Sequence, residues 1–307
     1  MAKYLLKKIL ILCASLFTVA TITFFLMHAV PGDPFSEDQP IPQEILDAMM
    51  THYGLDQPWY VQYGHFLKGL VTFDLGPSYK YQGRSVNAII AQNFPVSLVL
   101  GLEALCIALA CGLTLGTIAS LKHSKWQDHL AMIFSVVGIS VPSFILATML
   151  QYLFSMKLGI LPVARWGTFS HTILPALALA AMPTAFIARL TRASMIEVLE
   201  QDYIQTAKAK GVSTLQLICR HALKNSLLPV MSYIGYLSAT ILTGSFVVEK
   251  IFAIPGLGQW FVQSVMNRDY TVIMAVTLFY SAILMVSTFV VDILYCFLDP
   301  RISWRKQ

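Results

Sequence analysis

The stretch QDYIQTAKAKGVSTLQLICRHALKNSLLP, Gln201 to Pro229, is polar, helix-forming and weakly basic. It lies in a chain of 307 residues that is 56% hydrophobic and only 12% charged, with a mean hydropathy of +0.66. A soluble domain is about 25% charged, so most of this chain is expected to be solvated by lipid. The polar stretch therefore separates apolar segments, and its own structure decides how they are connected.

The sequence predicts a short helix in the first part of this stretch. Asp202 is expected to cap the helix, and its apolar face carries Tyr203, Ile204 and Ala207. Gly211 stands four residues later and fits the left-handed position that ends many helices. The chain is therefore expected to turn a corner at this glycine.

A second helix is predicted after the corner. Ser213 is expected to cap it, with Gln216 three residues later as in a capping box. The apolar stripe of this helix is expected to consist of Leu215, Ile218, Ala222 and Leu223. Pro229 marks the entry into the next apolar segment. Such a pair of helices either docks into a groove on a partner protein or lies on the lipid surface as an amphipathic segment.

Six apolar runs are each long enough to cross a hydrocarbon core of about 30 Å as helices. They cover approximately Ile9–Val30, Phe94–Leu121, Leu130–Phe154, Ile173–Leu190, Pro229–Val248 and Thr271–Phe297. The first run starts like a signal peptide. Its length and the following Pro31-Gly32-Asp33-Pro34, which lacks a small-residue cleavage site, predict an uncleaved span instead. A kink is expected in the fourth run, which contains Pro175 and Pro183.

The distribution of basic residues predicts the orientation of these spans. If the N-terminus lies in the cytoplasm, 14 of the 21 Lys and Arg residues fall on the cytoplasmic side. Both termini and the polar stretch are then cytoplasmic, and residues 31–93 form a long outer loop. That loop is rich in aromatic residues, and its pattern from Pro42 to His52 predicts a helix.

No motif in the chain predicts catalysis by this polypeptide. The sequence contains no Gly-Lys dipeptide and therefore no Walker A loop, no H-E-x-x-H and no G-x-S-x-G. The five cysteines form no C-x-x-C pair and the seven histidines show no ligand spacing, so no metal site is predicted. The basic residues form no tract of the kind that binds nucleic acid. Glu103 and Asp292 lie within spans, either as parts of an ion relay or as interhelical or interfacial hydrogen-bonding groups.

Within the polar stretch, Gln205-Thr206-Ala207 followed after three residues by Gly211 resembles the E-A-A-x-x-x-G loop of the membrane subunits of ABC importers. Gln205 and Thr206 replace the Glu and the first Ala of that motif. Leu223 fits the I-x-L-P ending of the family motif, whereas the positions of its Ile and Pro differ in this sequence, where they are His221 and Lys224.

Other motifs, in order along residues 31–301, are similar to the peptide/nickel class of these importers and most of all to the B-type permease of oligopeptide and dipeptide systems. They are Pro31-Gly32-Asp33-Pro34, Gly54-Leu55-Asp56-Gln57-Pro58, Asp74-Leu75-Gly76, Pro142-Ser143-Phe144, Ile254-Pro255-Gly256-Leu257-Gly258-Gln259, Asn267-Arg268-Asp269-Tyr270, Val291-Asp292 and Leu298-Asp299-Pro300-Arg301.

The resemblance implies an all-α integral membrane protein with six transmembrane helices, the type I ABC importer permease fold, and a cytoplasmic coupling-helix loop. It implies an N-terminal span and extracytoplasmic loop in residues 1–93, a five-span permease core in residues 94–298 that contains a coupling loop at 193–228, and a cytoplasmic tail at 299–307. The bacterial cytoplasmic, or inner, membrane is the expected location.

The implied function is that of the permease subunit of an ATP-driven importer of oligopeptides or dipeptides. The implied partners are a second related permease, two ATP-binding subunits and an extracytoplasmic solute-binding protein that delivers the cargo. ATP and Mg²⁺ are expected on the ATP-binding subunits, so this chain is expected to bind no cofactor and not to be an enzyme. The alternatives are a nickel or metal-chelate importer of the same class, an ATP-independent secondary transporter and a membrane scaffold without transport activity.

The resemblance also assigns the residues that couple this chain to an ATP-binding subunit. They are Tyr203, Thr206, Ala207, Lys208, Lys210 and Gly211, and the two lysines are expected to reach acidic groups on the partner. The outer loop is either a platform for the binding protein or a lid packed on the outer span ends. The segment Ile254–Gly258 either re-enters the membrane or forms a plain turn.

Overall fold

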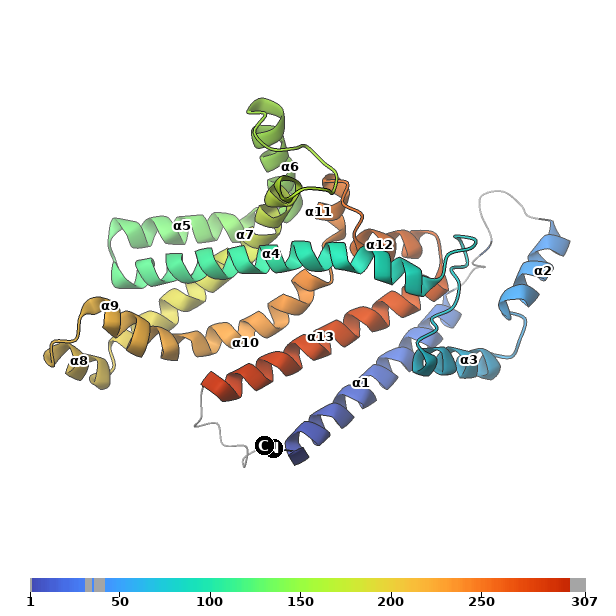
Figure 1. The fold of residues 1–307 in the computed structure, drawn as a ribbon, viewed down its shortest axis with the longest axis horizontal. Helices are drawn as coiled ribbons and strands as arrows, with labels where there is room; N and C mark the ends of the chain where they lie inside the picture. The colour runs from blue at the N-terminus through green and yellow to red at the C-terminus, as the bar shows by residue number, and fades with distance from the viewer. Residues whose placement is uncertain (1, 31–34, 36–41, 299–307) are drawn as a thin grey trace. The chain divides into compact units, whose positions relative to one another are not determined.

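The computed structural model describes residues 2–30, 35 and 42–298, and these residues form an all-helical protein (Figure 1). Among them, the β-structure is limited to one isolated antiparallel bridge between Pro77 and Ser85. The expected all-α class is therefore confirmed. The chain divides into a large unit, Ser97–Pro255 with residues from Ile283 onward, and a small unit, Ala2–Val96 with Gly256–Ala282. Each unit is described by itself.

The large unit is built around one long, deeply buried helix, α7 (Phe169–Leu199). The helices α5, α6 and α10 pack on it. The elements of this unit are most of α4 (Val86–Leu121), α5 (Trp126–Ser140), α6 (Ser143–Leu150), the π-helix η1 (Gln151–Lys157), α7, α8 (Asp202–Ala209), α9 (Thr214–Gln216), the π-helix η2 (Leu217–Ala222), α10 (Leu223–Leu242), α11 (Phe246–Ile251) and the end of α13 (Tyr270–Leu298).

Glycines allow α4 and α7 to approach each other closely. A Cβ atom on Gly112 would lie 2.7 Å from the side chain of Ile187. A Cβ atom on Gly116 would lie 2.5 Å from the carbonyl oxygen of Ala188 and 2.6 Å from Cβ of Thr191. Since lipid tails are as apolar as the helix surfaces, close backbone packing of this kind is a main source of helix association in membranes.

The small unit contains α1 (Ala2–Ala29), α2 (Gln43–Tyr53), α3 (Trp59–Thr72), the first turns of α4, α12 (Leu257–Met266) and the first part of α13. Its core joins the start of α4 to α12 and α13 through buried apolar side chains, namely Val86, Ile89, Ile90, Leu257, Val272, Ala275 and Val276. The helix expected from Pro42 to His52 is confirmed as α2, which ends at Gly54 in the left-handed conformation with a φ of 68°.

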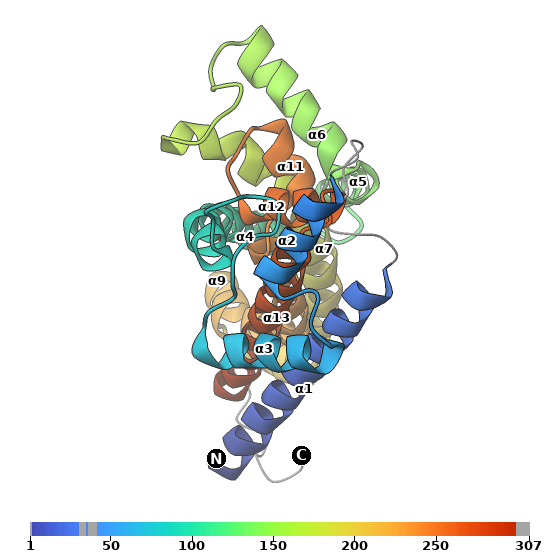
Figure 2. The ribbon, with the colours of Figure 1, turned by 90° about the vertical axis from the view of Figure 1, so that its right-hand side faces the viewer.

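Within residues 2–30, 35 and 42–298, five helices are long and apolar enough to cross a membrane, and up to six crossings result if one bent pair of helices counts as one span. The bent pair, Trp126–Ser140 and Ser143–Lys157, occupies the third predicted span. That span is not one straight helix, because its two parts are bent by 104°. Figure 2, which views α5 nearly end-on, shows α6 leaving it at a steep angle.

The bend falls at Val141 and Pro142. Val141 is extended, with φ of −84° and ψ of 117°, as a residue before proline tends to be. Pro142 then serves as the N-cap of α6. α7 continues as one helix through Pro175 and Pro183, and the kink expected there stays a prediction. The proline that breaks a predicted span is thus in the third one.

The fifth predicted span ends earlier than the hydropathy indicates. α10 stops at Leu242, and Gly244 adopts a left-handed conformation with a φ of 85° before α11 begins. A Cβ atom on Gly244 would collide with Oε1 of Glu249 and lie 3.0 Å from Oγ of Ser97. Ser97 in turn donates a hydrogen bond of 2.8 Å to this fully buried carboxylate. Only glycine fits the break, which separates α10 from α11.

Two expected features lie outside the described residues. They are the motif Pro31-Gly32-Asp33-Pro34 and the cytoplasmic tail 299–307. Of the segment Ile254–Gly258, residues 254–256 precede α12, and Leu257 and Gly258 are its first two residues.

Candidate functional site

The polar stretch folds as a helical hairpin, which we call the polar hairpin (residues 201–225). Its first helix is α8, and the predicted cap at Asp202 is wrong because Asp202 is already the first helical residue. Gln201 occupies the N-cap position in an extended conformation, with φ of −68° and ψ of 145°. Asp202 instead places a carboxylate in the first turn, where it interacts favourably with the positive end of the helix dipole.

Gly211 forms the predicted corner. Its φ is 79°, and the amide of Val212 donates to the carbonyl of Ala207 at 3.2 Å while the amide of Gly211 donates to that of Lys208 at 3.0 Å. These two bonds define a Schellman motif, in which a left-handed residue satisfies the last carbonyls of a helix. The space around Gly211 is open, so glycine is required here by its backbone conformation alone.

The second helix begins as predicted, but its apolar face differs from the prediction. Oγ of Ser213 accepts a hydrogen bond from the amide of Gln216 at 3.4 Å. Leu215, which was expected in the apolar stripe, is 72% exposed, whereas Leu217 is 3% exposed. In η2 a turn holds more residues than an α-turn, so Leu217 and Ala222 share the buried face five residues apart, and the 3.6-residue pattern that linked Leu215 to Ala222 does not hold.

The inner face of the polar hairpin packs on the end of α7. Met195 of α7 forms one buried cluster with Ile204, Leu217 and Ala222 of the hairpin. Ala207 is partly buried against the same cluster. The hairpin is therefore held to α7 by an apolar core of its own, and it is not a loose connection.

The outer face of the hairpin presents polar and cationic groups. Tyr203 is 42% exposed, and its hydroxyl accepts a hydrogen bond of 2.8 Å from Nδ2 of Asn225. The Thr206 hydroxyl donates to the carbonyl of Asp202 at 2.9 Å. Lys208 and Lys210 are both exposed. The six predicted coupling residues thus lie together on α8 and its corner, with Ala207 facing inward and the others at the surface.

An ion pair between a buried carboxylate and a half-buried guanidinium lies near the same end of α7. Asp128 of α5 is 2% exposed, and Arg192 of α7 holds both its carboxylate oxygens, with Nε to Oδ1 at 2.5 Å and a terminal nitrogen to Oδ2 at 2.7 Å. The amide of Ser124 donates to Oδ2 at 3.0 Å, and Nδ1 of His123 lies 3.3 Å from it. Arg192 is one of the basic residues counted for the orientation of the spans, and no role beyond that was predicted for it from the sequence. A carboxylate next to an apolar run was the available clue.

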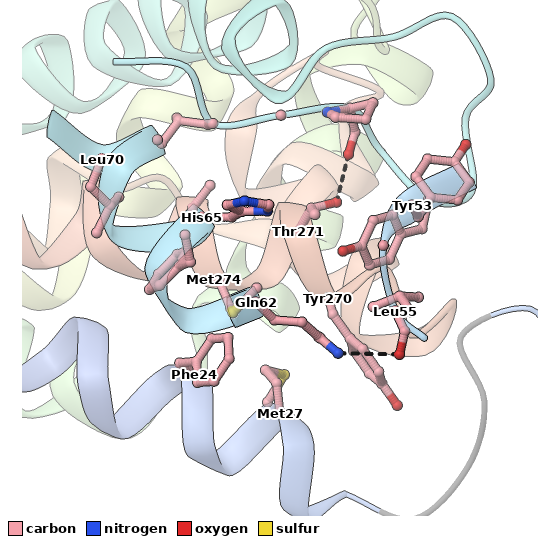
Figure 3. A pocket seen from close by; sticks show the side chains of 18 of the residues that line it. Phe24, Met27, Tyr53, Leu55, Gln62, His65, Leu70, Tyr270, Thr271 and Met274 are labelled. Atoms are coloured by element: carbon pink, nitrogen blue, oxygen red, sulfur yellow. Dashed lines mark hydrogen bonds between the residues drawn. The ribbon is translucent and has the colours of Figure 1, made fainter. Parts of the chain in front are cut away.

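The small unit contains a pocket of about 290 Å³. Side chains of α1, α3 and α13 converge on it, among them Phe24, His65 and Met274 (Figure 3). Gln62 is fully engaged at its edge, because its amide nitrogen donates to the carbonyls of Leu55 and Gln57 and its oxygen faces Nε2 of His28 at 3.1 Å. The pocket is slightly smaller than typical small-molecule sites, which begin at about 300 Å³.

A second buried carboxylate fixes the segment that precedes α4. Asp269, which is fully buried, accepts hydrogen bonds from the hydroxyl of Ser78, from the amide of Tyr79 at 3.2 Å and from the hydroxyl of Thr271 at 2.9 Å. Burial, and then the nearby charge of Asp269 and the phenol of Tyr53, raises the pKa of Tyr79 to about 12. The Tyr79 phenol is therefore held in its neutral form.

In residues 2–30, 35 and 42–298, no group of three or more His, Cys, Asp or Glu side chains is arranged to hold a metal ion. Glu103 is half-buried on α4, and Asp292 is half-buried on α13.

Comparison with known proteins gives matches along the whole chain. Residues 112–304 match the family described as "Binding-protein-dependent transport system inner membrane component", and residues 1–101 match "Binding-prot-dependent transport system membrane comp, N-term". The dipeptide transport system permease protein DppB of Bacillus subtilis is 49% identical over 307 residues, with 100% of both chains covered. The oligopeptide transport system permease protein OppB of Haemophilus influenzae is 41% identical, with 99% of this chain and 100% of the relative covered.

Among solved structures, the inward-facing MetNI methionine ABC transporter contains a chain with the same fold. The TM-score is 0.59 at 16% sequence identity, and the match covers 69% of this chain and 96% of that chain. At this identity the similarity concerns the fold, and it agrees with the expected type I importer architecture.

Proposed function

Because the chain belongs to the family of inner membrane components of binding-protein-dependent transport systems, we propose that it is the permease subunit of an ATP-driven importer of dipeptides or oligopeptides. The observation that carries this proposal is the polar hairpin, which is packed on its inner face and exposed on its outer face. As a multi-pass membrane permease subunit, the chain is not itself an enzyme. ATP hydrolysis is assigned to separate ATP-binding subunits.

Peptides are the proposed cargo because of the full-length relatives. Both DppB of Bacillus subtilis and OppB of Haemophilus influenzae are named as permeases of peptide transport systems. Their similarity favours peptides over nickel or a metal chelate, and it favours an ATP-driven system over a secondary transporter. A solute-binding protein on the outer side is proposed to deliver the peptide, and a second related permease is proposed to complete the pathway.

We assign the contact with an ATP-binding subunit to the outer face of α8. Tyr203, Lys208 and Lys210 are available there, and the lysines suit a groove with acidic side chains. Three residues fix the shape of the polar hairpin. Thr206 does so through its hydrogen bond to the carbonyl of Asp202, Ala207 through its packing against the cluster of Met195, and Gly211 through its left-handed conformation. With this face in the cytoplasm, both termini are cytoplasmic as well.

We further assign contact with the solute-binding protein to the small unit. In the outer loop, Tyr63 packs on Phe24 of α1, with ring centroids 5.1 Å apart. Trp59, Tyr60 and Phe73 remain more than half exposed. The packed rings give the loop a fixed shape, and the exposed rings suit an interface with a protein.

The test is the recovery of an ATP-binding subunit with the purified, detergent-solubilised permease, followed by peptide uptake in vesicles. Wild type is compared with an Ala207→Arg, Gly211→Val double variant, which disrupts both the packing of the polar hairpin and its corner. The expected result is recovery of the ATP-binding subunit with wild type only, together with ATP-dependent uptake of a labelled dipeptide.

Gly167→Val is the matched control, since Gly167 also has open space around it but an ordinary backbone conformation. This variant should behave as wild type. Equal recovery of the ATP-binding subunit with the double variant would remove the coupling role from the polar hairpin. Uptake of nickel but not of any peptide would overturn the substrate assignment.

A further inference from the structure

The end of α4, the start of α5 and the C-terminal part of α7 come together around the buried carboxylate of Asp128. The turn between α4 and α5 contributes the amide of Ser124 and the ring of His123, and α7 contributes Arg192. Ser124 adopts a left-handed φ of 60°, which is unusual for a residue with a side chain and directs its amide at the carboxylate. A terminal nitrogen of Arg192 also lies 3.1 Å from Nδ1 of His123, so one guanidinium contacts both partners.

We propose that Asp128 and Arg192 form a clasp that makes the α4–α5 turn move together with α7 and the polar hairpin during transport. The proposal rests on the coupling role assigned above to the hairpin. Within it, the two residues are positioning residues, because they touch neither the transported peptide nor the ATP-binding subunit.

A continuous series of contacts leads from the hairpin to the clasp. Ile204 of α8 packs in one buried cluster with Met195 of α7. Met195 stands three residues after Arg192 on the same unbroken helix, so a displacement of α8 acts on α7 less than one turn from the clasp. The hydrogen bonds from Arg192 then connect this displacement of α7 to Asp128 at the start of α5.

The chemistry of the pair suits a mechanical link. A bidentate contact between a guanidinium and a carboxylate fixes orientation as well as distance, which an apolar contact does not. Asp128 is 2% exposed and Arg192 is half-buried over it, so losing either partner removes both hydrogen bonds that join α5 to α7. Gly116 adds to this, because its missing side chain lets α4 lie against Thr191 and the amide of Arg192.

Two unsatisfied groups flank the clasp in sequence. Oγ1 of Thr191 and Oε1 of Gln127 are buried and make no hydrogen bond with the residues that the structure describes. Buried polar atoms without a partner are rare in native proteins.

The experiment uses the complete transporter, with its ATP-binding subunits, in proteoliposomes. Peptide uptake and ATP hydrolysis are measured in the same vesicles, and their ratio gives the uptake per ATP. Asp128→Asn and Arg192→Gln remove one charge each. We expect both to bind the ATP-binding subunit as wild type does, and to lower the uptake per ATP at least tenfold. Arg192→Lys keeps the charge but not the two-pronged contact, and should fall between these variants and wild type.

Arg189→Gln is the matched control, because Arg189 lies one turn earlier on α7, is exposed and loses the same charge. It should stay within twofold of wild type. If Asp128→Asn transports as much peptide per ATP as wild type, the clasp is not a coupling element. If that variant fails to reach the membrane, Arg192→Lys decides the matter in the same way.

A failure of the underlying proposal is recognised separately. It appears in the wild type itself, as a lack of bound ATP-binding subunit or of ATP-driven uptake. If wild type, Arg192→Lys and Asp128→Asn all take up the same amount of peptide per ATP, only the proposed role of the clasp is overturned.

Discussion

Asn225 at the start of α10 donates a hydrogen bond of 2.8 Å to the hydroxyl of Tyr203 in α8, which closes the polar hairpin across 22 residues of sequence. Tyr203 was expected to face the partner, and its 42% exposure leaves it available for that contact. The same side chain thus belongs to the proposed docking surface and to the internal structure of the hairpin.

Replacing Tyr203 by Phe should remove this hydrogen bond while keeping the ring. The expected cost is about 0.5–1.5 kcal/mol of stability, because the hydroxyl is partly solvated and Asn225 can turn to water. Asn225→Ala should cost a similar amount. The double variant should cost little more than either single one, and denaturant unfolding of the purified permease measures all three. Strictly additive losses would mean that the two side chains do not interact.

Gly211→Ala should destabilise the polar hairpin by about 1–2 kcal/mol, since a Cβ atom disfavours the left-handed conformation. Space is not the cause, because nothing lies within 4 Å of the added atom. Gly211→Asn should be milder, since asparagine tolerates this conformation better. Amide hydrogen exchange in residues 201–225 reports the effect locally, with Gly167→Ala as the comparison. Unchanged exchange in Gly211→Ala would exclude a backbone requirement at this corner.

Gly116→Ala should destabilise the folded permease for the opposite reason, which is a lack of space. The new methyl group would meet the carbonyl oxygen of Ala188 at 2.5 Å and force α4 away from α7. Overpacking of this kind costs about 1–3 kcal/mol. Gly64→Ala is the contrasting control, because Gly64 lies in α3 with nothing within 4 Å. The yield of folded permease and its thermal unfolding should fall for the first variant and not for the second.

The raised pKa of Tyr79 predicts that the stability of the folded permease decreases at alkaline pH. Its pKa is about 12 in the folded protein and about 10 in the unfolded chain, so the folded state holds the phenolic proton more tightly. The stabilising contribution is complete below pH 10 and is lost as the pH rises towards 12. Titration of phenolate absorbance should show one late-ionising group that disappears in Tyr79→Phe. The variant should also lose less stability than wild type over this pH interval. A late group that persists in Tyr79→Phe would assign the shift to another tyrosine.

The sequence predicted those features that depend on local backbone chemistry. The corner at Gly211, the cap at Ser213 and the helix predicted from Pro42 to His52 were found where expected, because left-handed and capping positions have strong residue preferences. Five apolar runs became long helices for an equally local reason, the need to satisfy backbone groups in lipid.

The failures involve geometry that depends on the tertiary packing or on the choice between competing local signals. Leu215 and Leu217 exchanged roles because η2 changed the helical period, and no residue type marks a π-helical turn. Pro142 broke its span whereas Pro175 and Pro183 did not break theirs, so composition alone did not identify the bend. Asp128 and Arg192 are 64 residues apart, and only the packing of α5 on α7 brings them together.

Because of the bend at Pro142, the apolar length along the sequence differs from the length along one helix axis, although hydropathy treats the two as equal. The 15 residues of α5 rise about 22 Å, less than the roughly 30 Å thickness of a hydrocarbon core. Residues 143–157 continue at 104° and so add almost nothing along the axis of α5. The apolar sequence of this pair is therefore about twice as long as the distance that the pair covers along the axis of α5. About half of the third predicted span runs at a steep angle to that axis.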